Sequence, residues 1–245
     1  MRCTILGAAT GAFAEFPGKS MTMTEAGDIT RKVLVWDAPT RLFHWLVVAL
    51  VAAAYVTWRL NWMNWHALAG DVLLALLFFR LLWGVLGSET ARFSRFLVSP
   101  RNAARHLAGA LRHEPDRQAG HNPAGGWMVV LLLALLLGET LTGLYVDNDV
   151  AVEGPLTELV PARIADLVTT LHTVLWQALL AAVALHLLAI LVYAVAKRQN
   201  LVLPMITGRK SLPDSVPQPG IAGPARALLM LGGSALAAAA LIKFL

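Results

Sequence analysis

The chain is poor in cysteine, with only Cys3 among its 245 residues. A single cysteine excludes an internal disulfide and an iron–sulfur cluster held by several thiolates. It also excludes the C-x-x-C-H attachment of a c-type haem, so any haem would have to bind non-covalently. Histidine, with seven copies, is therefore the residue type from which a transition-metal site in the spans would be built.

Charged residues are scarce as well. They make up 14% of the chain, against about 25% in soluble domains, while 57% of the residues are hydrophobic. This composition predicts an integral membrane protein made mostly of helical spans, with little room for a separate soluble domain. The formal net charge of +5 comes from basic residues that flank the spans, which argues against a nucleic-acid partner.

The first 32 residues carry no organised pattern. Their basic start is weak and Glu15 follows the apolar patch, so they make a poor secretory signal. Met21 and Met23 are possible alternative starts. We expect residues 1–32 to form a mobile segment.

Five apolar runs are long enough to cross a bilayer, which requires about 20 helical residues. They predict an all-α fold: a transmembrane four-helix bundle in residues 33–210, then a Pro/Gly-rich linker and a fifth transmembrane helix in residues 211–245. A short amphipathic helix starting at Pro100 is expected on the membrane surface. The runs cover residues 42–60, 65–86, 126–146, 167–196 and 225–245.

The distribution of charge orients these spans. Arg31, Lys32 and Arg41 precede the first span, and six arginines lie between the second and the third. The loop after the third span is acidic. Because cytoplasmic loops carry an excess of lysine and arginine, the N-terminus is predicted to be cytoplasmic, with the spans alternating from there.

The fourth span contains no charged residue but carries His172 and His186, fourteen residues apart. In an α-helix this spacing is a rise of about 21 Å and a rotation about 40° short of four turns. Both imidazoles therefore project from nearly the same face, at two depths in the membrane. Polar side chains at such depths are costly and are functional candidates by default.

Two histidines on other spans lie at matching depths. His44 begins the first span on the inner side, and His66 begins the second on the outer side. Topology therefore pairs His44 with His186 and His66 with His172. Zinc favours four ligands at one point, whereas two facing imidazoles suit a planar macrocycle, so the pattern favours two non-covalently bound haems. The alternative for each histidine is a packing or hydrogen-bonding role.

Arg80 and Gly70 extend this prediction. Arg80 follows His66 by fourteen residues and shares its face, so a propionate of the inner haem could pair with it. Alternatively, Arg80 reaches out to the inner membrane interface. Gly70, one turn after His66, removes a side chain where a flat ring would pass close to the backbone.

The remaining polar candidates have several interpretations. Glu139, in the third span, is either a protonated, helix-bonded residue or a group that exchanges protons with a quinol near the outer haem. His106, His113 and His121 lie in the arginine-rich loop, and we expect them to be solvated and not to act as ligands.

Several segments resemble the bacterial cytochrome b561 family, including the b-type cytochrome subunits of nickel–iron hydrogenases. They are VWDAPTRLFHW at the first span, HALAGDVLLALLFFRLLWGVLGSETARFSRF at the second, GHNPAGGWMVVLLLALLLGETLTGLY at the third, the histidine pair of the fourth and the tail NLVLPMITGRK. The resemblance implies a multi-pass protein of the bacterial cytoplasmic (inner) membrane. It also implies two b haems with bis-histidine ligation by His44, His66, His172 and His186.

The resemblance further implies electron transfer between quinone or quinol and a redox partner, such as a periplasmic cytochrome c or a hydrogenase-type partner. The acidic outer loop would attract a basic partner. One alternative is a quinone-linked superoxide oxidase, for which the outer loops offer only Arg59 and Arg163 as cations. The other is a haem-free membrane anchor or assembly subunit whose histidines hold the bundle together.

Overall fold

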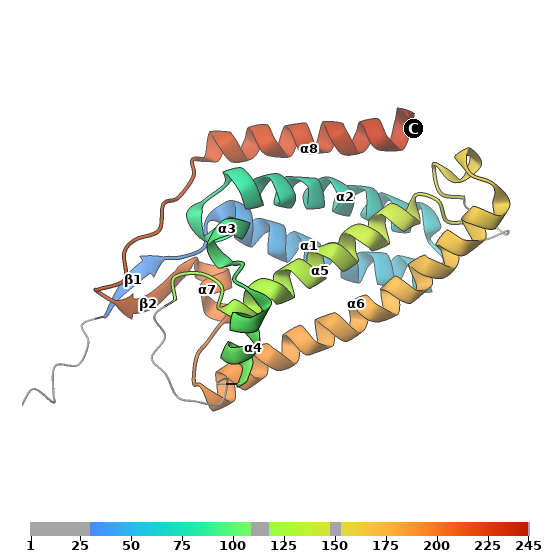
Figure 1. Cartoon of the computed structure of the whole chain (residues 1–245). Helices are drawn as coiled ribbons and strands as arrows, with labels where there is room; N and C mark the ends of the chain where they lie inside the picture. Colours follow the sequence, from blue (N-terminus) through green and yellow to red (C-terminus); the bar gives the residue numbers. More distant parts are fainter. Residues whose placement is uncertain (1–29, 109–117, 148–152, 245) are drawn as a thin grey trace, which may run out of the picture.

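A computed structural model describes residues 30–108, 118–147 and 153–244, and most of the predicted mobile segment lies outside these ranges. Within the described part, five helices are long and apolar enough to cross a membrane. They run alongside one another in Figure 1. The prediction of an all-α membrane bundle with a fifth, C-terminal span is confirmed. The helices are α1 (Ala38–Arg59), α2 (Met63–Leu86), α5 (Pro123–Gly143), α6 (Ala162–Ala196) and α8 (Pro224–Phe244).

A two-stranded antiparallel sheet marks one end of the bundle, which we call the strand end. Strand β1 (Thr30–Leu34) pairs with β2 (Arg209–Pro213), and the short helix α7 (Val202–Thr207) precedes β2. The side chains of Val33 and Leu212 are fully buried there. The sequence did not predict these strands, and both predicted boundaries of the bundle, at residues 33 and 210, fall within them.

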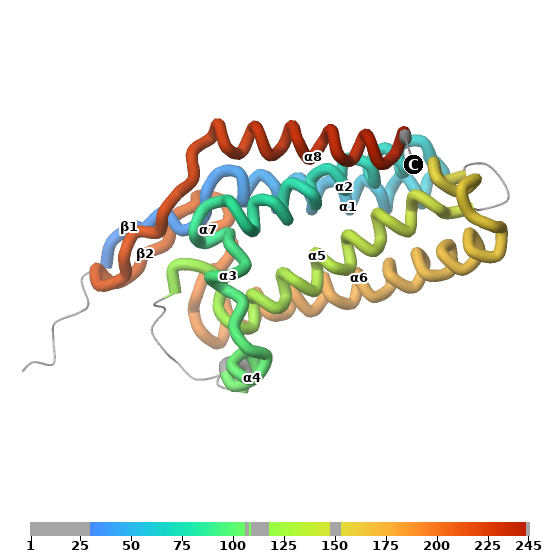
Figure 2. Tube along the Cα trace, turned by 45° about the horizontal axis from the view of Figure 1, so that its top comes forward, coloured from blue at the N-terminus to red at the C-terminus, as the bar shows by residue number. Residues whose placement is uncertain are grey.

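The opposite end, which we call the loop end, carries the α1–α2 turn and the connection from α5 to α6 (Figure 2). The described part of that connection includes the 3₁₀ turn η2 (Thr157–Leu159). Among the described residues between α2 and α5 there are three short helices at the strand end, and the last of them begins at the predicted Pro100. These are η1 (Glu89–Ala91), α3 (Phe93–Phe96) and α4 (Pro100–Ala108).

The apolar core lies midway between the two ends. Val47 of α1, Leu73 of α2, Leu133 of α5 and Leu179 of α6 are all buried and belong to one cluster. All four helices of the predicted bundle therefore contribute to the same layer.

The spacing of the histidines places this layer between them. Leu179 is seven residues from both His172 and His186, and seven residues are nearly two helical turns. The two histidines and the leucine between them therefore share one face of α6. Helix α2 repeats this spacing around Leu73, so one apolar layer separates two levels of polar side chains.

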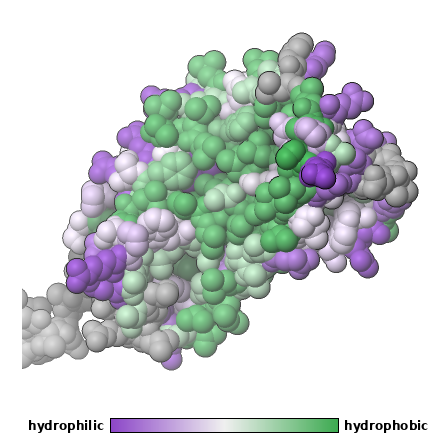
Figure 3. All heavy atoms as spheres, turned by 45° about the vertical axis from the view of Figure 1, so that its right-hand side comes forward, coloured by the Kyte–Doolittle hydropathy of each residue, from purple (hydrophilic) through white to green (hydrophobic). Residues whose placement is uncertain are grey.

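Helix α8 packs along α2 on the outside of the bundle (Figures 1 and 2). Its buried residues are small: Ser234 is 1% exposed and Ala238 is 2% exposed. Small side chains let two helices approach closely within a membrane. In the view of Figure 3, apolar surface covers the middle of the molecule and polar side chains gather toward its ends, as a lipid-facing belt requires.

Asp37 connects the start of α1 to α2. Its Oδ1 accepts a hydrogen bond from the Thr40 N–H at 2.7 Å, which caps the helix, and its Oδ2 accepts one from Trp83 Nε1 at 3.0 Å. The carboxylate is buried, with Asp37 only 2% exposed. One side chain thus satisfies two buried donors on different helices.

The double role of Asp37 generates a stability prediction. Asp37→Asn keeps an oxygen for the helix cap but presents an amide group to Trp83, so we expect about 1–3 kcal/mol less stability from the unpaired donor. Asp37→Ala also loses the cap, which adds about 0.5–2 kcal/mol. Thermal unfolding in detergent measures both. Asp214→Asn, at an exposed ion pair with Arg31, is the control, and equal stability of Asp37→Asn and wild type would refute the account.

Candidate functional site

His66 and His172 lie next to each other near the loop end. Their ring centroids are 6.4 Å apart and their planes are inclined at 84°. A histidine nitrogen binds a transition metal at about 2 Å. Two such bonds plus the radii of the two rings account for the observed separation. The predicted pair therefore has the spacing that would suit one metal ion held between the two imidazoles.

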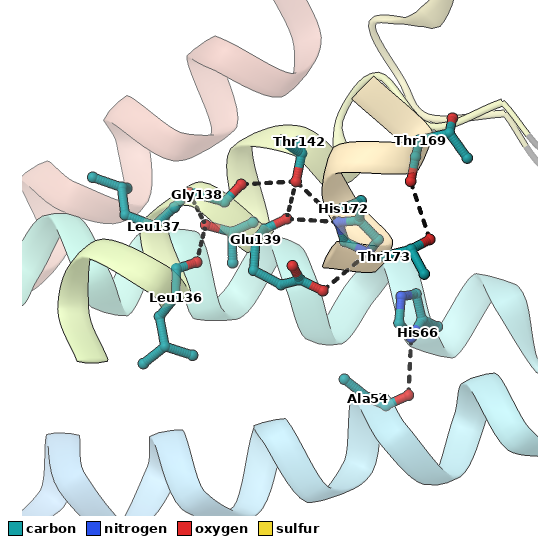
Figure 4. A network of polar contacts seen from close by, with 11 residues as sticks. Ala54, His66, Leu136, Leu137, Gly138, Glu139, Thr142, Thr169, His172 and Thr173 are labelled. Atoms are coloured by element: carbon teal, nitrogen blue, oxygen red, sulfur yellow. Dashed lines mark hydrogen bonds and ion pairs between the residues drawn. The ribbon is translucent and has the colours of Figure 1, made fainter. Parts of the chain in front are cut away.

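The Nδ1 atom of each of these rings is hydrogen-bonded away from the other ring. His66 Nδ1 lies 2.9 Å from Ala54 O, and His172 Nδ1 lies 3.0 Å from Glu139 O and from Thr142 Oγ1 (Figure 4). Because a carbonyl oxygen only accepts, both Nδ1 atoms carry the proton. Each Nε2 then keeps its lone pair, as a metal ligand must.

Thr142 reinforces this arrangement of His172. Its hydroxyl group donates within α5, where Gly138 O lies 2.8 Å away, which leaves a lone pair to accept from His172 Nδ1. A Cβ atom at Gly143 would lie 3.3 Å from His172 Cε1, so this glycine lets the ring lie against α5. We did not predict Gly143 from the sequence, although its place one turn after Glu139 could have indicated it.

Glu139 is directed at the same histidine. Its Oε1 lies 3.4 Å from His172 Nε2, the nitrogen left free for a ligand role. Its Oε2 is buried and has no hydrogen-bond partner among the described residues. Figure 4 shows the carboxyl group turned toward the His172 ring. The carboxyl group therefore contacts this histidine, and its exchange of protons with a quinol stays a prediction.

Open space adjoins Gly70, one turn after His66. A Cβ atom built at this position meets nothing within 4 Å. The prediction that a flat ring passes here is compatible with this space.

His44 and His186 form the second predicted pair, toward the strand end. The structure places them close enough to interact electrostatically. His44 Nδ1 is buried without a hydrogen-bond partner in the described ranges, and its ring meets the edge of Trp45 at a centroid distance of 4.9 Å. An unpaired buried nitrogen fits a site completed by a further group.

Arg80 is buried at the same end, with 3% of its surface exposed. Its guanidinium group lies over the Phe93 ring, 5.1 Å from the centroid, and Nη1 donates to Ala91 O at 3.3 Å. This burial is inconsistent with the alternative in which Arg80 reaches out to the membrane interface. The cation is instead held within the protein.

The expectation that His121 is solvated is wrong. Its ring lies between Trp36, at 4.6 Å between centroids, and Phe96, at 4.7 Å. Burial, followed by the charges of Arg80, His186 and His44, lowers the pKa of His121 to about 3. The imidazole is therefore neutral.

The start of α5 determines the position of His121, which is partly buried. Asn122 caps this helix through its Oδ1, which accepts from Gly125 N at 2.7 Å. An Asn followed by a Pro is a sequence signal for a helix start. This pair could therefore have shown that His121 lies at the edge of α5 and not within the polar loop. His113 lies outside the described residues, as does the side chain of His106.

These observations describe a multi-pass helical membrane protein with paired histidines at two levels, the architecture of a membrane cytochrome. A family model described as prokaryotic cytochrome b561 matches residues 35–208, well over half of the chain. The chain therefore belongs to the prokaryotic cytochrome b561 family. It is a membrane b-type cytochrome of electron transfer, and b-type haem is its cofactor class. No curated protein and no solved structure matches it.

The open space beside Gly70 generates a second prediction. On the prediction that His66 and His172 hold a haem, Gly70→Leu should fill that space and lower the haem count by one per chain in a pyridine haemochrome assay. Gly232→Leu is the matched control, because Gly232 also lies in a helix with nothing within 4 Å. Leucine favours helix over glycine by nearly 1 kcal/mol, so neither variant should unfold. An unchanged haem count in Gly70→Leu would show that the space serves another purpose.

Proposed function

We propose that the chain is a di-haem cytochrome that transfers electrons between the quinone pool and a redox partner across the bacterial cytoplasmic membrane. The axial ligand pairs are His66 with His172 and His44 with His186. The observation that supports this most strongly is the 6.4 Å separation of the His66 and His172 rings, with both Nδ1 atoms hydrogen-bonded away from the shared space. A haem iron held by two imidazoles would supply one-electron transfer and would leave no position for dioxygen.

The protein residues orient and separate the two sites. Ala54 O and Glu139 O accept from the Nδ1 atoms of His66 and His172 and so hold these rings in the required tautomer. The leucine layer around Leu179 keeps water out of the interior between the two levels. Helix α6 fixes their separation, because fourteen helical residues rise about 21 Å.

The charges support an orientation with the strand end in the cytoplasm. Exposed basic residues gather there, whereas the connection from α5 to α6 at the loop end is acidic. Cytoplasmic loops of membrane proteins carry an excess of lysine and arginine. In this orientation the N-terminus is therefore cytoplasmic, and the loop end faces the periplasm. The strand-end cations include Arg31, Lys32 and Arg209.

The two alternatives have less support. A superoxide oxidase would attract an anion, yet Asp147, Glu153 and Glu158 make the loop end acidic. A haem-free anchor would use its histidines as bundle contacts. His66 and His172 make such contacts, whereas the buried His44 Nδ1, which should then also bond to another helix, has no partner among the described residues.

Counting haem in single variants tests the proposed pairs. We expect two low-spin b haems per chain in a redox-titrated visible spectrum with a pyridine haemochrome assay. His66→Ala and His172→Ala should each lose one and the same haem, and His44→Ala and His186→Ala the other. His113→Ala, outside both pairs, should keep both. A colourless wild-type protein from cells able to supply haem would support the anchor instead.

The acidic loop generates a prediction about the partner. Neutralising Asp147, Asp149, Glu153 and Glu158 together should slow electron exchange with a basic soluble cytochrome c, and the difference should shrink as salt screens the charges. Stopped-flow spectroscopy at several ionic strengths measures this rate. Glu89→Gln with Asp214→Asn, at the strand end, is the control pair. A rate that does not change would remove this loop from the docking surface.

A further inference from the structure

Buried polar atoms without partners gather at the strand end. Most buried polar side-chain atoms in proteins have a hydrogen-bond partner. Within the described ranges, Thr40 Oγ1, His44 Nδ1 and His121 Nδ1 have none. Thr40 and His44 are four residues apart in α1 and so lie on the same face of that helix. His121 also interacts electrostatically with His44, His186 and Arg80, so the unpaired atoms belong to the same end of the bundle.

The packing of His121 holds its ring in place without any hydrogen bond to Nδ1. Trp36 and Phe96 contact the ring with centroid distances of 4.6 and 4.7 Å, both at interplanar angles of 55°. Two aromatic contacts restrict the direction in which the ring nitrogens point. Such a constraint suits an imidazole whose partner is not part of the protein chain.

The nearby groups are hydrogen-bond donors. The Thr40 hydroxyl, an imidazole N–H of His121 and the guanidinium group of Arg80 can all donate, and the charge of Arg80 acts on His121. The carboxylate oxygens of Asp37 already accept from Thr40 N and Trp83 Nε1. The complementary group is therefore a further anion with several acceptor oxygens.

We propose that His121 is a positioning residue for the haem of the His44–His186 pair. Together with Thr40 and Arg80, it binds a carboxylate at the edge of that haem. This inference rests on the proposed function, since a b haem carries two propionate carboxylates. It adds two residues, from α1 and from the loop before α5, to the role that the sequence suggested for Arg80 alone.

The test compares His121→Phe with His121→Gln in the full-length protein. Phenylalanine retains the packing against Trp36 and Phe96 but removes the donor, whereas glutamine retains an N–H donor. In His121→Phe the strand-end haem should become easier to oxidise, because the carboxylate charge is less compensated. We expect a shift of up to tenfold in the redox equilibrium, which is about 59 mV for one electron. His121→Gln should restore most of it.

Two further measurements make the readout specific. The haem of the His66–His172 pair is an internal control whose potential should not move, and His66→Ala identifies which signals belong to the strand-end haem. Redox-difference infrared spectra of protein with ¹³C-labelled haem propionates should show shifted carboxylate bands in His121→Phe. Thr40→Val, which has nearly the same shape as threonine, should change the same bands.

Each outcome decides the proposal. Shifted potential and shifted labelled bands support it, as does loss of the strand-end haem from His121→Phe but not from His121→Gln. Two haems with unchanged potentials and bands in both His121→Phe and Thr40→Val would overturn it and leave the proposed function intact. A shifted potential with unchanged labelled bands would point to a free anion, such as phosphate, and also overturn it. Absence of haem from the wild-type protein would refute both proposals.

Discussion

The hydrogen bonds from histidine Nδ1 to backbone carbonyls underlie the arrangement of the loop-end site. His66 is bonded to α1 through Ala54 O, and His172 is bonded to α5 through Glu139 O. Neither ring is bonded to its own helix, so each bond joins two helices and orients one imidazole at the same time. In a membrane interior, where water does not compete, such a bond determines both the tautomer and the direction of the ring.

The histidine rings are held by different contacts at the two ends of the bundle. At the loop end, backbone carbonyls and Thr142 hold the rings. At the strand end, His44 Nδ1 has no partner among the described residues, and His121 is held by aromatic contacts. The two sites therefore differ in polarity and in the charges around them. Such differences in hydrogen bonding and burial are the means by which proteins give two similar haems different potentials.

Much of this structure could be predicted from the sequence because membrane constraints are simple. Apolar length predicted the five spans. Charge asymmetry and the fourteen-residue spacing were enough to pair His66 with His172, whose rings the structure places together. The assignment of all four histidines as ligands stays a prediction.

The missed features depend on contacts between distant segments. Strand β1 contains no alternating pattern, and its partner β2 is formed only after α6, so pairing could not be read locally. His121 lies in a polar stretch, and its partial burial depends on Trp36 and Phe96 from two other segments. The role of Gly143 depends on the His172 ring, which lies on another helix.

The strand pair also has a consequence for the order in which the protein is built. Strand β1 precedes the first span, whereas β2 follows the fourth, so the sheet can form only once nearly the whole bundle has been synthesised and inserted. Until β2 has been made, β1 has no partner strand. His186, on α6, is likewise made long after His44, on α1. The complete strand end, with both strands and both of its paired histidines, is therefore available to a prosthetic group only after β2 has been made, and α8 still follows.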